Sequence, residues 1–235
     1  LEASWRGLGV PAAPTIVIDV LAAFAAGSAE PEGVVLSAGT GAIAAAVADH
    51  RLVRRADGHG WLVGDAGSAV WLGIQGTRAA LESLDGRGPA TSLSARVPEA
   101  LGLEMTAPAD IAEEVVTATY SRPPAELGGI APTVVEAARQ GDRVAIALVE
   151  QAADELSRTL AAVAAEAVPR VVVLAGSLLT HAEPIDRGVR RRLEARCPDV
   201  PLSRASSAEA GAVALAVARH HDRPVAAEVL DRLRG

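Results

Sequence analysis

Two short apolar runs, GVVLSAG at 33–39 and RVVVLAG at 170–176, constrain the fold of this sequence more than any other feature. Neither run alternates apolar with polar residues, as a strand with one solvated face does. Strands of this kind need cover on both faces of their sheet. Because stretches with helical spacing separate the two runs, the sequence predicts an α/β fold with helices on both faces of the sheet.

Further strands are predicted from short runs bounded by turn residues. TIVID at 15–19 and VPLSRA at 200–205 are each interpreted as one strand, and 42–58 as a hairpin, which makes the sheet mixed. Asp142 is a suitable N-cap for one of the longer helices. Apolar residues at helical spacing predict helices at 20–26, 66–84, 109–118, 129–140, 142–167, 184–196, 207–221 and 224–234.

Composition excludes several classes of protein. The net charge of −7 disfavours binding to nucleic acid, which usually shows a basic patch. The single cysteine, Cys197, excludes an internal disulfide framework and a four-cysteine metal site within the chain, and it is compatible with a reducing compartment. No apolar run reaches the length of a transmembrane helix. We therefore expect a cytoplasmic protein that binds neither nucleic acid nor a membrane.

Gly39, Thr40 and Gly41 separate the strand at 33–39 from the predicted hairpin. Glycines permit positive φ and let a phosphate approach backbone N–H groups closely, while the threonine adds a hydroxyl donor. The same tripeptide is also compatible with an ordinary tight hairpin. It matches neither the P-loop nor the dinucleotide-binding pattern, because no lysine follows and the glycine spacing differs.

Two aspartates stand where a strand gives way to a helix. Asp19 follows the run at 15–18 and is either a general base for a substrate hydroxyl or the N-cap of the helix at 20–26. Asp65 lies in the glycine-rich segment GHGWLVGDAGS, where it could accept hydrogen bonds from sugar hydroxyls, cap the helix that starts near Ala66, or do both. In the same segment, Trp61 is either a stacking platform or a core residue. Gly176 ends the run at 170–176, where it could let a nucleotide lie against the backbone.

The order of these segments along the chain resembles that of a known family. Asp19 and its helix are followed by VVLSAGTGAIAAAV, GHGWLVGDAGSAVWLGIQGTRAAL, VVVLAGSLL and AGAVALA. Together they look like the N-acetylglucosamine kinase branch of the BadF/BadG/BcrA/BcrD ATPase family, within the sugar kinase/actin/Hsp70 superfamily. The resemblance covers the chain from about residue 13 to residue 218 and is most specific between Gly33 and Leu81.

The resemblance implies an actin-like ATPase, in which ATP lies between two domains of the ribonuclease-H type. Residues 33–218 would be the C-terminal domain, and residues 1–32 a remnant of the N-terminal one. The helix within 219–235 would return to that N-terminal domain. Because nothing in residues 1–18 matches the family's first phosphate loop, Asp-Gly-Gly-x-x-Thr, we expect the front of the first domain to be missing. The family often dimerises, so we also expect a homodimer.

The resemblance also implies a role for each candidate residue, with ATP and Mg²⁺ as cofactors. No metal ligand is assigned. Two substitutions depart from the family pattern: Ala42 replaces the serine after Gly-Thr-Gly, and Ala66 replaces the glutamate of Gly-Asp-Glu-Gly-Ser. The implied roles are Asp19 as catalytic base, Gly39, Thr40 and Gly41 for the ATP phosphates, Asp65, Gly60 and Trp61 for the sugar, and Gly176 and Ser177 for the adenosine.

Three functions are compatible with this pattern. The first is an ATP-dependent kinase that phosphorylates an amino sugar, N-acetylglucosamine or glucosamine. The second is a regulatory protein of the same fold that binds a sugar or nucleotide without catalysis. The third is the ATPase that activates a dehydratase or reductase. Those activators hold a [4Fe–4S] cluster with two cysteines per chain, and a sequence whose single cysteine is Cys197 disfavours this function.

Overall fold

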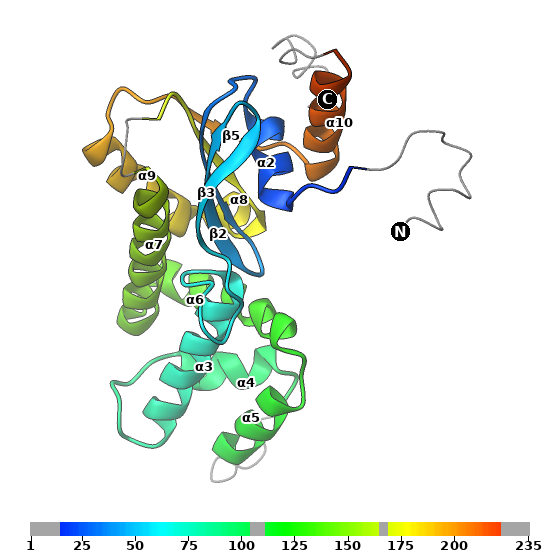
Figure 1. Cartoon of the computed structure of the whole chain (residues 1–235). Helices are drawn as coiled ribbons and strands as arrows, with labels where there is room; N and C mark the ends of the chain where they lie inside the picture. The colour runs from blue at the N-terminus through cyan, green and yellow to red at the C-terminus, as the bar shows by residue number, and fades with distance from the viewer. Residues whose placement is uncertain (1–14, 104–110, 165–168, 222–235) are drawn as a thin grey trace, which may run out of the picture.

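A mixed sheet of five strands, in the order β3-β2-β1-β4-β5, organises the structure (Figure 1). The computed structural model describes residues 15–103, 111–164 and 169–221. β1 pairs in parallel with β4, and β4 with β5, whereas β2 is antiparallel to both β1 and β3. The prediction of a mixed sheet is confirmed. The strands are β1 (Gly33–Ala38), β2 (Ala42–Ala48), β3 (Arg51–Asp57), β4 (Val172–Ala175) and β5 (Leu202–Arg204).

The central strands are buried on both faces, as their uninterrupted apolar sequences predict. In β1, Leu36 belongs to the core on one face of the sheet, whereas Val35 belongs to the core on the other. Leu174 and Val173 of β4 divide between the two cores in the same way. Successive side chains of a strand point to opposite faces, so both cores draw on the same apolar run.

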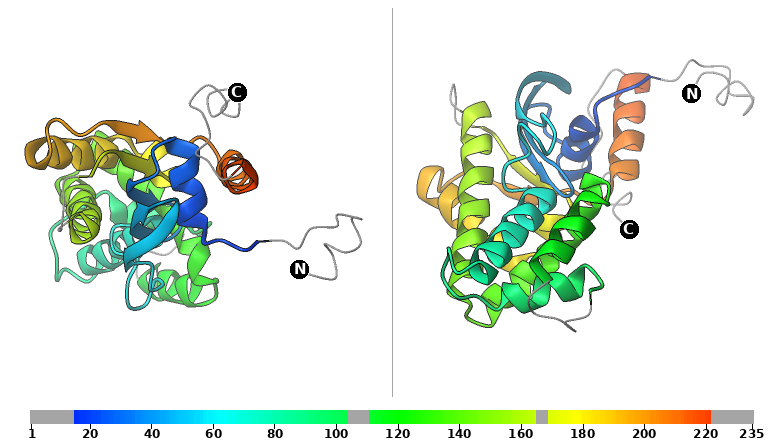
Figure 2. Two further views of the ribbon diagram at one scale, coloured as in Figure 1. Left: turned by 45° about the horizontal axis from the view of Figure 1, so that its top comes forward. Right: turned by 90° about the horizontal axis from the view of Figure 1, so that it is seen from below.

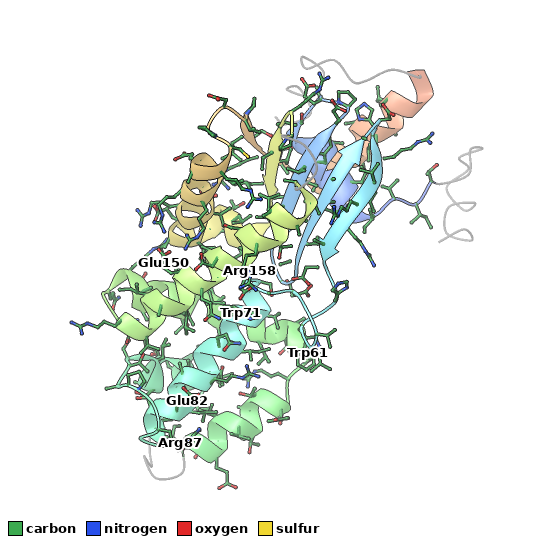
Figure 3. All side chains as sticks on the ribbon, turned by 60° about the vertical axis from the view of Figure 1, so that its left-hand side comes forward. Trp61, Trp71, Glu82, Arg87, Glu150 and Arg158 are labelled. Atoms are coloured by element: carbon green, nitrogen blue, oxygen red, sulfur yellow. The ribbon has the colours of Figure 1, made fainter. Side chains whose placement is uncertain are left out.

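Two pairs of helices cover the sheet (Figures 1 and 2). α7 (Arg143–Val163) and α9 (Glu183–Arg196) lie on one face, where Glu150 of α7 forms ion pairs with two arginines of α9 (Figure 3). α2 (Asp19–Gly27) and α10 (Ala208–His221) lie on the other face. These two helices approach so closely that a Cβ at Gly211 would lie 1.8 Å from the carbonyl oxygen of Ala22. This contact explains a glycine inside a helix.

The remaining helices gather beyond the carboxyl end of β1, where α3 is the central member (Figure 1). A Cβ at Gly73 of α3 would lie 2.0 Å from the carbonyl oxygen of Leu127, so the two segments pack backbone to backbone. The sequence did not predict α4, which is short and contains Pro98. The elements are α3 (Ala69–Leu84), α4 (Leu93–Ala100), α5 (Ile111–Tyr120), the 3₁₀ helix η1 (Pro124–Ile130), α6 (Ala131–Arg139) and α8 (Ser177–His181).

The predicted strand at 15–19 is wrong. Residues 15–18 have no regular structure, and Asp19 is the first residue of α2. A strand requires a neighbour for its backbone hydrogen bonds, and none of the described strands pairs with this segment. Ile16 is 76% exposed. Within the described ranges, the β-branched run therefore has strand propensity but no partner strand.

The predicted division at residue 32 stays a prediction. α2 belongs to the predicted N-terminal remnant, yet Phe24 is buried in the core that this helix shares with β1, β4 and α10. The opening residues 1–14 and the predicted helix at 224–234 lie outside the described residues, as does the predicted end of the helix at 142–167. Among the helices that the structure describes, none has the length and apolar content needed to cross a membrane.

Candidate functional site

Six of the nine predicted site residues converge at the carboxyl ends of β1 and β4, around a cavity of about 430 Å³. Ligands of open α/β sheets bind at this edge, and the volume is within the usual range for small-molecule sites. The lining residues come from five separate stretches of the chain. They are Ile18, Asp19, Ser37, Gly39, Thr40, Gly41, Ala42, Ile43, Arg55, Gly58, Asp65 and Gly176.

The Gly-Thr-Gly loop is both a tight hairpin and a source of backbone donors. It joins β1 to β2, and the N–H of Gly39 donates to the carbonyl of Gly41 at 2.9 Å. The carbonyls of Gly39 and Thr40 accept hydrogen bonds from the first amides of α3, at 2.9 and 3.3 Å. Within the described part of the chain, nothing accepts from the N–H groups of Thr40 and Gly41. These two donors at the cavity are therefore available to a ligand.

Asp65 lies directly against this loop. A Cβ at Gly41 would lie 2.7 Å from Oδ2 of Asp65, so the close approach requires glycine. Oδ1 of Asp65 accepts one long hydrogen bond, from the N–H of Gly60 at 3.4 Å. The alternative that Asp65 caps the next helix is wrong, because Ser68 is the N-cap of α3 and accepts from the N–H of Trp71 at 3.2 Å. The Asp65 carboxylate lines the cavity.

Asp19 occupies the first position of α2, one residue after the N-cap, Ile18. The prediction that Asp19 is the N-cap itself is therefore wrong by one position. Its Oδ1 accepts from the N–H of Val20 at 2.7 Å, and the side chain is otherwise exposed at the cavity. The N-terminus of a helix favours a negative charge, so this position stabilises the carboxylate form while leaving an oxygen accessible.

Gly176 and Ser177 join the first cavity to a second one. Gly176 has φ +95°, and a Cβ there would lie 2.2 Å from the carbonyl oxygen of Ala38, so β1 and β4 end in close contact. Ser177 begins α8 and lines a mostly apolar cavity of about 310 Å³. The lining residues of this second cavity are Ala69, Gly128, Ala131, Pro132, Val135, Arg139, Ser177, Leu178, His181 and Ala182.

Two predicted sugar-binding residues do not line either cavity. Trp61 is 46% exposed on the loop between β3 and α3 (Figure 3), beside the still more exposed Leu62 and Val63. The interpretation of Trp61 as a core residue is therefore wrong. Gly60 contacts the site indirectly, through its hydrogen bond to Asp65. A direct role for Trp61 or Gly60 in sugar binding stays a prediction.

The sequence did not identify Arg55 or Asp57. Arg55 lies on β3 and is the one basic residue among those lining the first cavity. Asp57 ends β3, and its carboxylate accepts from the backbone N–H groups of Asp65 and Ala66. Successive side chains of a strand point to opposite faces, so Arg54 and Arg55 lie on different faces of β3. Only the position of the strand in the sheet shows that Arg55 is the one at the cavity.

The residues present fit a nucleotide with its magnesium ion. Unpaired N–H groups beside small residues suit phosphate oxygens. Bound to phosphates, Mg²⁺ usually takes only one or two protein carboxylates, and Asp19 and Asp65 line the same cavity. Within the described ranges, no group of three or more histidine, cysteine, aspartate or glutamate residues is arranged to hold a metal by itself.

Known proteins share this fold. A solved structure from Chromobacterium violaceum, titled as a candidate N-acetylglucosamine kinase, has a TM-score of 0.69 and 25% identity and covers 89% of this chain and 70% of that one. A similarly titled protein of Porphyromonas gingivalis has a TM-score of 0.60 and 22% identity, covering 87% and 65% of the two chains. A ROK family glucokinase of Streptomyces griseus, in complex with glucose and AMPPNP, has a TM-score of 0.52 at 18% identity, covering 88% and 68%. The chain therefore has the actin-like ATPase fold of sugar kinases, as predicted.

The sequence comparisons identify the family. The N-acetylmuramic acid/N-acetylglucosamine kinase of Clostridium acetobutylicum is 30% identical over 165 residues, which is 69% of this chain and 52% of that protein. The chain thus spans about half the length of this curated relative. The model of the BadF/BadG/BcrA/BcrD ATPase family matches residues 16–216. The chain therefore belongs to the BadF/BadG/BcrA/BcrD ATPase family.

Proposed function

We propose that this chain carries the phosphate- and sugar-binding site of an ATP-dependent kinase that phosphorylates an amino sugar, N-acetylglucosamine or glucosamine. One observation carries the proposal. Thr40 and Gly41, whose N–H groups have no acceptor among the described residues, line the same cavity as Asp19 and Asp65. Phosphoryl transfer needs anion donors beside a group that orients the attacking hydroxyl, and this cavity offers both. The family and the amino-sugar kinases among its relatives support this reading.

We assign the nucleotide to both cavities. The phosphates accept hydrogen bonds from Thr40 and Gly41, and Arg55 offsets part of their charge. The adenosine extends past Gly176 and Ser177 into the apolar second cavity, where a flat base replaces water against aliphatic side chains. Because Ser177 lies beside Gly39, with its Oγ 3.4 Å from a Cβ built at that glycine, one molecule can reach both cavities.

We assign the sugar to the side of the first cavity that holds the two aspartates. Asp65 accepts hydrogen bonds from sugar hydroxyls. The hydroxyl oxygen of the sugar forms a bond to the γ-phosphorus of ATP, and Asp19 takes the hydroxyl proton. The bond between the γ-phosphorus and the β,γ-bridging oxygen breaks, which releases ADP. When bound, Mg²⁺ supplies neutralisation of phosphate charge. Within the cell we expect a cytoplasmic homodimer.

The experiment is a coupled assay of ADP release with N-acetylglucosamine, glucosamine, N-acetylmuramic acid and glucose. It is run on this chain and on the complete product of its gene. Sugar-dependent ADP release that Asp19→Asn abolishes is the expected result. Tight ATP binding with no turnover on any of the four sugars would overturn the kinase in favour of the regulatory alternative.

A further inference from the structure

The carboxylate of Asp57 holds the turn that carries Asp65. Its Oδ1 accepts from the N–H of Asp65 at 2.7 Å, and its Oδ2 accepts from the N–H of Ala66 at 2.9 Å. Both acceptor oxygens of one charged group are thus used by two successive amides. Hydrogen bonds to a charged acceptor are shorter and stronger than neutral ones, so this pair fixes the turn to the end of β3.

The surrounding backbone is shaped to admit this contact. A Cβ at Gly64 would lie 2.4 Å from Oδ1 of Asp57, so only glycine lets the carboxylate approach. Asp57 and Asp65 have φ +61° and +54°, in the left-handed region that aspartate tolerates better than most residues. A strained backbone persists where neighbouring contacts over-determine it, and the two hydrogen bonds that the Asp57 carboxylate accepts do so here.

The consequence lies in the direction of the Asp65 side chain. While its N–H is bonded to Asp57, its carboxylate lies against Gly41 and within reach of the N–H of Gly60, and Asp65 lines the cavity. We propose that Asp57 is a positioning residue that fixes the orientation in which Asp65 binds the sugar. This inference rests on the proposed function for the role of Asp65, but the contact itself does not.

The main variant is Asp57→Asn, which keeps the size and tolerance of left-handed φ but turns one acceptor oxygen into an NH₂ group facing an N–H. The expected result is a sugar KM raised about tenfold, with kcat and the KM for ATP within about twofold of the parent. Asp49→Asn is the matched control. Asp49 stands at the other end of β3 with φ +49° and is exposed, and no hydrogen bond to its carboxylate occurs among the described residues.

A double-mutant cycle separates positioning from a general loss of stability. If Asp57 acts through Asp65, then adding Asp57→Asn to Asp65→Asn raises the sugar KM no further. Equal effects of Asp57→Asn in both backgrounds would overturn the proposal, because Asp57 would then act independently of Asp65. A rise in the KM for ATP equal to that for sugar would also overturn it, since the whole site would then be affected.

Amide hydrogen exchange tests the contact without any activity. In the parent, the N–H groups of Asp65 and Ala66 should exchange slowly, and Asp57→Asn should speed both by about tenfold while amides of the buried strand β1 keep their rates. Unchanged exchange at residues 65 and 66 would overturn the positioning role. If the parent protein released no ADP with any sugar while this result held, the kinase proposal would fail and the contact would stand.

Discussion

The carboxylate of Asp142 and the carboxylates of Asp19 and Asp65 have very different surroundings. Asp142 is the N-cap of α7 and accepts five hydrogen bonds. Among the described residues, Asp19 accepts one, from Val20, and Asp65 accepts one long one, from Gly60. The five donors to Asp142 are the N–H groups of Val144, Ala145 and Ser92 and the hydroxyls of Thr91 and Ser92, at distances from 2.6 to 3.0 Å.

The difference separates a structural polar group from a binding one. Protein donors occupy the acceptor oxygens of Asp142, and these hydrogen bonds connect α7 to the segment before α4. Little hydrogen-bonding capacity is left for a ligand. At the first cavity, counting only partners in the part of the chain that the structure describes, two carboxylates retain unfilled acceptors and two amides of the Gly-Thr-Gly loop retain unfilled donors. Polar groups that the fold leaves unpaired beside a cavity are the ones that a ligand can pair.

Removing the charge of Asp19 is expected to have the largest effect. Asp19→Asn keeps the size of the side chain but cannot accept the proton of the attacking hydroxyl. We expect kcat to fall by roughly 10²–10⁴-fold, as measured by ADP release. The affinity for ATP in the absence of Mg²⁺, measured by nucleotide titration, should be unchanged. Asp142→Asn is the matched control at neutral pH. An equal loss of kcat in that variant would contradict the assignment of Asp142 as structural and Asp19 as catalytic.

A methyl group at Gly41 is expected to have the next largest effect. In Gly41→Ala the new Cβ lies 2.7 Å from Oδ2 of Asp65, so the loop or the carboxylate must move. Overpacking of this size costs about 1–3 kcal/mol, so we expect kcat/KM to fall roughly 10- to 100-fold. Gly129→Ala serves as the control, because no atom lies within 4 Å of a Cβ built there. Full activity of Gly41→Ala would show that the loop and Asp65 need not touch.

The sequence was sufficient for what depends on local pattern. The apolar runs without alternation predicted the buried strands. The family resemblance implied that Asp19, Gly39, Asp65 and Gly176 belong to one site, and these four residues line one cavity, although their roles stay a prediction. The sequence failed where a tertiary partner decides the outcome. The run at 15–18 has strand propensity, but none of the strands that the structure describes lies beside it. Pro98 inside α4 kept the sequence pattern from predicting that helix.

The parts of the site that the sequence missed are those that act through space. Arg55 reads as one arginine in an exposed run, and only the placement of β3 at the sheet edge brings it to the cavity. Asp57 reads as part of an ordinary Asp-Gly turn. Its hydrogen bonds join residues eight and nine positions apart, through a loop whose course no periodicity predicts.

Loss of the arginine at the cavity tests the charge balance of the site. Arg55→Gln removes the one basic side chain among the residues lining a cavity that also holds two carboxylates. Because Arg55 is exposed, solvent and salt screen its charge, and we expect only about a tenfold rise in the KM for ATP. This rise should be smaller at high salt. Arg54→Gln is the control, since its side chain points to the opposite face of β3. Equal effects of the two variants on the KM for ATP would contradict the assignment of Arg55 to the nucleotide site.

The smallest effect is expected at Asp142, in stability and not in activity. Although partial burial alone would raise the pKa of Asp142, hydrogen bonds from the N–H groups of Ala145 and Ser92 and from the hydroxyls of Ser92 and Thr91 lower it from 3.8 to about 2. A carboxylate whose pKa is lower in the folded state stabilises the fold above its unfolded pKa, and this contribution is lost as the pH falls through the folded value.

Asp142→Asn keeps an acceptor for the α7 amides but lacks the charge. We expect it to lower the free energy of unfolding by about 1 kcal/mol at pH 7, with the difference shrinking between pH 4 and pH 2. Urea unfolding at several pH values measures this, and a difference that stayed constant down to pH 2 would show that the hydrogen bonds, without the charge, account for the stabilisation.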